Sequence, residues 1–100
     1  MKTIQEWQKI ISEATNRKFP NNVNKSQMDR VKSIKEQLED VENSLKVEQG
    51  LLKNDDHAHQ DPDHRIAALI ANIFILAEMR GSKIEKELEK VLSWFQQTKV

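Results

Sequence analysis

Two glutamates in the segment IKEQLED, Glu36 and Glu39, are the first side chains whose type and spacing could support chemistry. At a spacing of three they project from one side of a helix, one turn apart. Such a carboxylate pair can bind a hard divalent cation such as Mg²⁺, which prefers oxygen ligands. A solvated helix face shows the same pattern, and the spacing alone favours that interpretation because glutamate pairs are common in helices.

A second group of polar side chains is the segment DDHAHQDPDHR, residues 55–65, which contains all three histidines of the chain. His57 and His59 would lie together only in an extended or turned loop. Because the chain has no Cys and no third ligand is fixed nearby, the pattern disfavours a zinc site. His64 differs, since it falls in the first turn of the following helix. It is interpreted as a polar surface or interhelical residue, with ligand contact as the alternative.

The end of the same segment is typical of a helix start. Asp61 can accept hydrogen bonds from free backbone N–H groups, Pro62 suits the first helical position, and Asp63 lies near the positive end of the helix dipole. Capping therefore explains both aspartates without a metal ion. Contact of Asp61 with a metal ion remains the alternative hypothesis.

Asn72 is the one polar residue in the apolar run 66–77. A buried amide must be hydrogen-bonded, so Asn72 either holds a neighbouring helix or contacts a ligand or a metal-bound water. Arg65 shares a helix face with Asn72. Its guanidinium group could bind a phosphate through two parallel hydrogen bonds, or pair with a glutamate of the preceding helix.

Hydrophobic periodicity predicts four helices that would position these residues. The first helix opens with a capping box at Thr3–Glu6 and ends at Phe19–Asn22, and the second runs from about residue 24 to about residue 49. The third follows Asp61 and is apolar on nearly every side to Met79, which predicts a central, buried helix. A second capping box at Ser82–Glu85 opens the fourth. Short connections between four helices predict an all-α, four-helix antiparallel bundle.

The composition indicates one domain, residues 1–100, with balanced charge. The chain has 16 basic and 16 acidic side chains, and this disfavours nucleic acid and acidic membranes as partners. No apolar run is long enough for a signal core or a membrane span, so a cytoplasmic location is expected. A chain of 100 residues covers an apolar central helix poorly, which predicts a homodimer or a larger homo-oligomer.

Several segments together resemble one family. IKEQLEDVENSLKVEQGL, residues 34–51, resembles the metal-binding helix of the MazG-like nucleoside triphosphate pyrophosphohydrolases, with Glu36 and Glu39 on its E-x-x-E pair. TIQEW followed by FPNN is similar to the opening of small members. ILAEMRGSKIEKELEKVL is similar to the last helix-turn-helix of the family.

This resemblance implies an all-α fold in a dimer or tetramer, and a Mg²⁺-dependent reaction, with Mn²⁺ as an alternative ion. A nucleoside triphosphate would be cleaved between its α and β phosphates to give the monophosphate and diphosphate. The cation would lower the pKa of a bound water and neutralise phosphate charge. Glu36 and Glu39 would be the catalytic metal ligands, and Lys32 and Arg65 are the residues expected to contact the substrate.

The chain departs from the family at its second acidic pair, E-x-x-D. Alignment without gaps backwards from Gly81 puts Arg65 and Ala68 there, and deleting one helical turn puts Asn72 at the last acid. Asp61, His64 and Asn72 are then the residues left to complete a metal shell. The sequence therefore supports two hypotheses: a pyrophosphohydrolase, or a catalytically degenerate helical module that binds nucleotide or a protein partner without turnover.

Overall fold

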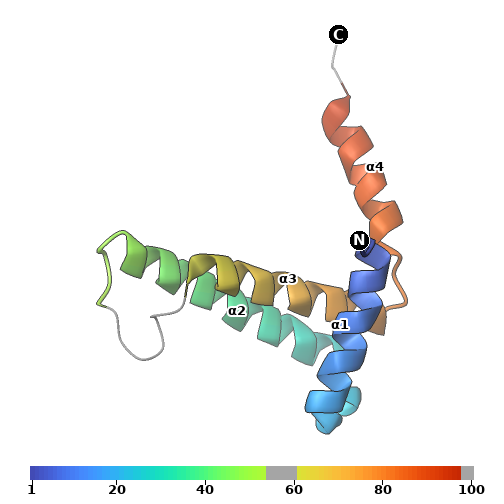
Figure 1. Ribbon diagram of the computed structural model, residues 1–100, viewed down its shortest axis with the longest axis horizontal. Coiled ribbons are helices and arrows are strands. Elements are labelled where there is room, and N and C mark those ends of the chain that lie inside the picture. Colours follow the sequence, from blue (N-terminus) through green and yellow to red (C-terminus); the bar gives the residue numbers. More distant parts are fainter. Residues whose placement is uncertain (54–60, 98–100) are drawn as a thin grey trace.

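A computed structural model describes residues 1–53 and 61–97. These residues form five helical elements and no strand: α1 Ile4–Lys18, the short 3₁₀ helix η1 Pro20–Asn24, α2 Gln27–Glu48, α3 Pro62–Met79 and α4 Ile84–Gln96 (Figure 1). The prediction of an all-α chain with four α-helices is confirmed for the described residues.

The helix starts follow local side-chain chemistry. The capping box predicted for α1 is present, because the Glu6 N–H donates to Thr3 Oγ1 at 3.1 Å and the Thr3 N–H donates to the Glu6 carboxylate at 3.3 Å. The predicted cap of α3 is also confirmed, since Asp61 accepts a hydrogen bond from the Asp63 N–H at 3.0 Å and Pro62 follows it.

α2 begins slightly later than the sequence predicted. Asn24 belongs to η1, and α2 starts at Gln27 behind its N-cap Ser26. A second capping box explains this start. The Asp29 N–H donates to Ser26 Oγ at 3.0 Å, and the Ser26 N–H donates to the Asp29 carboxylate at 2.9 Å.

The two glycines of the chain end α2 and α3 in the same way. Gly50 and Gly81 have φ angles of 76° and 67°, a left-handed conformation that strains residues with a Cβ atom. After α3, the Ser82 N–H donates to the Ala77 carbonyl oxygen at 2.9 Å, which is the long hydrogen bond of a Schellman motif.

This ending explains why the capping box predicted at Ser82–Glu85 is wrong. The N-cap of α4 is Lys83, and its side chain makes no capping hydrogen bond. The backbone N–H of Ser82 closes the end of α3, and its carbonyl oxygen accepts a hydrogen bond from Gln8 Nε2 at 2.8 Å. Ser82 is therefore part of the α3 terminus rather than the start of the next helix.

α3 is the central helix: it packs along antiparallel α2 on one side and against α1 on another (Figure 1). α4 instead projects away from the α2–α3 pair and makes few contacts, mainly with the N-terminal part of α1 (Figure 1). Three helices therefore pack together within the chain. The fourth helix does not join them side by side, so the predicted four-helix bundle is present only in part.

The interior of this arrangement is small and partly polar. The buried apolar side chains among the described residues are Val41, Ile75 and Ala77, whereas the buried polar ones are Gln8, Ser12, Asn22, Arg30 and Ser44. The prediction that the third helix is buried on nearly every side is wrong for a single chain. Ile66, Ile70 and Ile73 are 41%, 45% and 41% exposed, because one short chain does not have enough neighbouring helices to cover them. None of the described helices is long and apolar enough to cross a bilayer.

Candidate functional site

The most unusual polar group in the structure is the guanidinium group of Arg30, which lies between α2, α3 and η1. Arg30 is only 4% exposed. Its Nη1 donates to Asn72 Oδ1 at 2.8 Å, and its Nη2 donates to Asn22 Oδ1. Asn22 in turn donates from its amide nitrogen to Asn16 Oδ1 at 2.6 Å. Three asparagine amides thus form a chain that fixes the guanidinium plane.

The charge of Arg30 is not balanced by a carboxylate among the described residues. Its two hydrogen-bond acceptors are neutral amides, it makes no ion pair there, and its Nε atom is buried without a hydrogen-bond partner. Desolvation lowers the pKa of Arg30 below its ordinary value. Buried charges in proteins are usually paired, so this guanidinium lacks the anion that would normally accompany it.

A cavity of about 390 Å³ lies beside Arg30. It is bounded by the end of α1, η1, the first half of α2 and the middle of α3, and the lining residues are Thr15, Phe19, Asn22, Lys25, Arg30, Ser33, Glu36, Gln37, Ala68, Ala71, Asn72 and Ile75. Gln37 Oε1 is a second buried polar atom without a partner in this wall. An adjacent cavity of about 530 Å³ shares Asn22, Lys25 and Ile75 with it.

The two glutamates predicted to bind metal are both exposed on α2. Glu36 lines the cavity beside Arg30, whereas Glu39 does not. Within residues 1–53 and 61–97, no three or more His, Cys, Asp or Glu side chains come together in a group that could hold a metal ion. The described carboxylates do not form a complete shell by themselves, and Mg²⁺ in proteins usually takes one or two carboxylates together with waters and substrate phosphates.

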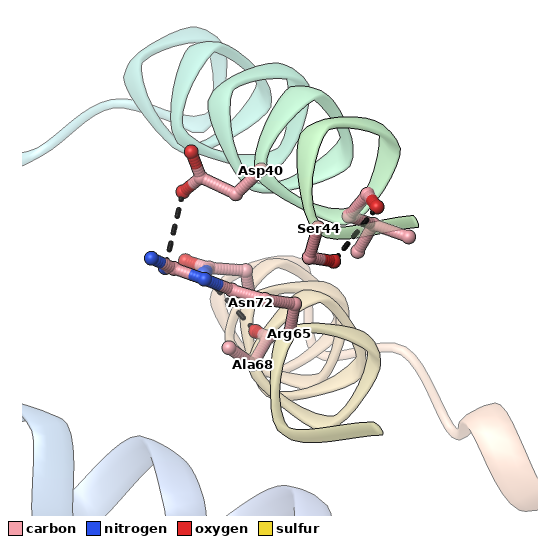
Figure 2. A network of polar contacts seen from close by, with 6 residues as sticks. Asp40, Ser44, Arg65, Ala68 and Asn72 are labelled. Carbon is pink, nitrogen blue, oxygen red and sulfur yellow. Dashed lines mark hydrogen bonds and ion pairs between the residues drawn. The ribbon is translucent and has the colours of Figure 1, made fainter. Parts of the chain in front are cut away.

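Asn72 uses both ends of its amide within the protein. Its oxygen accepts the hydrogen bond from Arg30. Its nitrogen donates to the Ala68 carbonyl oxygen at 3.2 Å (Figure 2). The interhelical role that the sequence left open is thus present. Asn72 also lines the same cavity as Glu36, so the structure brings these two predicted site residues to one space.

Arg65 extends from α3 across to α2 and pairs with an aspartate. Its Nη1 lies 3.3 Å from Asp40 Oδ2, and the two side chains are 17% and 39% exposed (Figure 2). The sequence predicted that Arg65 either contacts a phosphate or pairs with a glutamate of the preceding helix. The observed partner is the residue directly after Glu39, so the arginine brings positive charge next to the predicted metal ligands.

The remaining candidate residues that the structure describes do not line the cavity beside Arg30. Asp61 and His64 are exposed at the start of α3, where Asp61 caps the helix. Lys32 is exposed on α2 and does not line the cavity beside Arg30. His57 and His59 lie outside the described residues.

Sequence reasoning missed Arg30 and its asparagine partners. A pattern in α2 could have found it, because Arg30, Ser33, Gln37, Val41 and Ser44 recur at steps of three and four. This stripe combines one charged and three polar side chains with Val41, so it differs from the apolar pattern that predicts a buried face. Charged and polar residues are mostly exposed in proteins, so the physical rule pointed to the wrong face.

Comparisons of the chain with protein-family models, with curated protein sequences and with solved structures gave no match.

Proposed function

We propose that the chain is a MazG-like helical module that binds a nucleotide without hydrolysing it. The observation that supports this proposal is the ion pair between Arg65 and Asp40 at 3.3 Å. Arg65 occupies the position where the resemblance expects the first acid of the second metal-binding pair. A positively charged arginine therefore faces α2 at the position where a carboxylate ligand for a metal ion would be required.

The electrostatic consequence is unfavourable for a divalent ion. Arg65 engages the carboxylate next to Glu39, and buried Arg30 adds a second positive charge beside the cavity that Glu36 lines. Like charges raise the free energy of a bound cation, most strongly where solvent screening is weak. The same charges favour an anionic ligand such as a nucleotide phosphate.

The cavity beside Arg30 has suitable dimensions for such a ligand. Its volume of about 390 Å³ lies within the range of about 300–1,000 Å³ that is common for small-molecule sites. Lys25 and Arg30 supply positive charge, and Phe19 supplies an aromatic surface against which a base can stack.

A pyrophosphohydrolase is the second candidate, because Glu36 and Asn72 line the same cavity. In this case a nucleoside triphosphate is cleaved between its α and β phosphates with Mg²⁺ or Mn²⁺. Glu36 and Glu39 would contribute two oxygen ligands. Further ligands would have to be added to them, for example from a second copy of the chain.

The test is a panel of nucleoside triphosphates with Mg²⁺ or Mn²⁺, in which calorimetry measures binding and a coupled assay measures diphosphate release. We expect binding without diphosphate release above the uncatalysed rate. Release that Glu36→Gln abolishes would contradict the proposal and support the hydrolase. Glu48→Gln is the matched control, since Glu48 is exposed at the far end of α2 and lines neither cavity.

Self-association completes the proposal. Large apolar side chains are exposed on α2, α3 and α4, among them Leu38, Ile70, Leu92 and Phe95 at 56%, 45%, 54% and 70%. Exposed large apolar side chains of this kind favour burial against another molecule. We propose a homodimer or homotetramer in which a second copy covers these helices.

A further inference from the structure

The unpaired charge of Arg30 is the feature of the described residues with the strongest physical consequence for the kind of ligand that the cavity can bind. Arg30 as a whole residue is only 4% exposed, so much of its surface is removed from water. Its two hydrogen bonds to asparagine oxygens use some of its N–H donors, but neither acceptor carries a negative charge. A bound anion would supply the negative charge that is missing beside Arg30.

We infer that Arg30, with Lys25, binds a phosphate group in the 390 Å³ cavity between α1, α2 and α3, and that this binding needs no metal ion. The ligand is a tetrahedral oxyanion, either free inorganic phosphate or the phosphate of a monoester. This inference rests on the proposed function, because it uses the same cavity, and it narrows the required ligand to one phosphate group, which is sufficient to occupy the site.

The geometry favours an anion over a cation at this place. Three charged side chains line the cavity: Lys25, Arg30 and Glu36. Two of these belong to α2, where Arg30 is buried and Glu36 is exposed. Arg30 is held in a fixed plane by Asn22 and Asn72, so little side-chain entropy is lost when it binds. A planar guanidinium matches the oxygen spacing of phosphate.

Lys25 is suited to close the site from the outside. It lies at the junction of η1 and α2, lines both cavities and is exposed. A flexible ammonium group at the entrance can follow an anion into the cavity as a mobile charge, whereas the buried arginine determines its orientation.

The experiment measures phosphate binding in the presence of a metal chelator and at constant ionic strength, by calorimetry and by thermal melting. Inorganic phosphate, a sugar monophosphate and a nucleoside monophosphate are compared with the matching phosphate-free sugar and nucleoside. We expect phosphate compounds to bind and to raise the melting temperature in a saturable way, since a ligand of the folded state stabilises it. Tighter binding of a monoester than of inorganic phosphate identifies the ester as the source of the anion.

Arg30→Gln should weaken phosphate binding at least tenfold while it retains an amide for Asn22 and Asn72. Arg17→Gln is the matched control, because Arg17 is an exposed arginine in the last turn of α1 and should leave the affinity unchanged. If Arg30→Gln does not fold, Lys25→Gln provides the second variant, with an expected loss of several-fold. The inference is overturned if the wild type binds no phosphate compound, or if these variants bind as tightly as the wild type. Nucleotide binding that is insensitive to Arg30→Gln would overturn this site and leave the proposed function standing.

Discussion

The seam between α2 and α3 and the projecting helix α4 have opposite distributions of polar and apolar side chains. The seam encloses Arg30 and Ser44, which are 4% and 2% exposed. α4 has no buried residue at all, and its Trp94 and Phe95 are 67% and 70% exposed. A single chain thus has polar groups in its interior and large aromatic groups in solvent.

This contrast shows that the two regions lack different kinds of partner. Exposed apolar area is unfavourable by about 25 cal/mol per Å², so α4 gains most from burial against another helix surface. The seam between α2 and α3 is already covered, and what Arg30 lacks is a negatively charged partner among the described residues. One region therefore requires a macromolecular surface, and the other requires a small anion.

The largest expected effect comes from breaking the apolar side of this comparison. Leu92 is 54% exposed in the single chain, and Leu92→Lys places a charge in the surface that we propose to be covered by a second copy. The variant should dissociate at least tenfold more readily, because truncating or charging a central interface residue often costs more than about 1.4 kcal/mol. Light scattering at micromolar concentration measures the mass. Ser93→Lys adds the same charge at the neighbouring position of α4 and should remain associated. A wild-type protein with the mass of a monomer would contradict the proposal.

Introducing the second acidic pair that the proposed resemblance to MazG-like proteins would require tests the polar side. Arg65→Glu combined with Ala68→Asp removes the ion pair with Asp40 and adds two carboxylates to the seam. In chelator the variant should melt roughly 5–15 °C lower, since about 1 kcal/mol corresponds to about 4–8 °C for a domain of this size.

Mn²⁺ should restore part of this loss in the double variant and have little effect on the wild type, because a cation neutralises the added carboxylates. Ala67→Asp is the control, as Ala67 is exposed on the same helix. An equal response of all three proteins to Mn²⁺ would show that the seam cannot be converted into a metal site.

A smaller change of opposite sign is expected for Asn72→Asp. The new carboxylate would accept the hydrogen bond that Arg30 now donates to the amide oxygen at 2.8 Å, and would neutralise the buried charge. Melting in chelator should rise by roughly 3–8 °C. The same substitution should weaken phosphate binding, because the carboxylate competes for Arg30.

The metal-binding hypothesis for Asn72 makes the contrary prediction. If Asn72 faces a cation, Asn72→Asp should be less stable than the wild type in chelator and recover when Mn²⁺ is added. Melts of both proteins with and without Mn²⁺ separate these cases. Asn21→Asp adds a carboxylate to an exposed position of η1 and should change little.

The smallest expected effect concerns the capping box that starts α2 next to the seam. Hydrogen bonds from the Ser26 backbone and then from its hydroxyl hold the pKa of Asp29 below its ordinary value of 3.8. Because the folded-state pKa is lowered, Asp29 contributes stability above about pH 4, and this contribution is lost as the pH falls through the folded-state pKa.

Ser26→Ala should raise the pKa of Asp29 towards its ordinary value and lower the melting temperature slightly at pH 7. Nuclear magnetic resonance titration of the Asp29 carboxyl group measures the first effect. The difference in melting temperature from the wild type should shrink at acidic pH, and a difference that grows there would contradict the assignment. Ser93→Ala, on exposed α4, is the control.

Local features of the fold were predictable, whereas features that depend on distant segments were not. The caps at Thr3 and Asp61 and the stops at Gly50 and Gly81 follow from groups within a few residues of each other. The capping box at Ser82 was wrong although its motif is local. The Ser82 carbonyl accepts from Gln8, which is 74 residues away, and its N–H belongs to the preceding helix.

The candidate site shows the same division. Glu36 and Asn72 could be selected from residue type and spacing, and they do line one cavity. Arg30 was not selected, because charged residues are mostly exposed and its partners Asn22 and Asn72 approach it from two other elements. The choice of Asp40 as the partner of Arg65 likewise depends on the register between α2 and α3, because these two residues are 25 positions apart in the chain.

The sequence by itself determined the helical class, the number of helices and most of their ends, because hydrogen bonds inside helices and at their caps connect near neighbours. The tertiary structure alone decided which face of each helix is covered. It placed a charged arginine in the interior and left aromatic residues of α4 outside, because burial depends on the number and position of neighbouring helices. A chain of 100 residues has too few of them to bury every apolar face that its periodicity predicts.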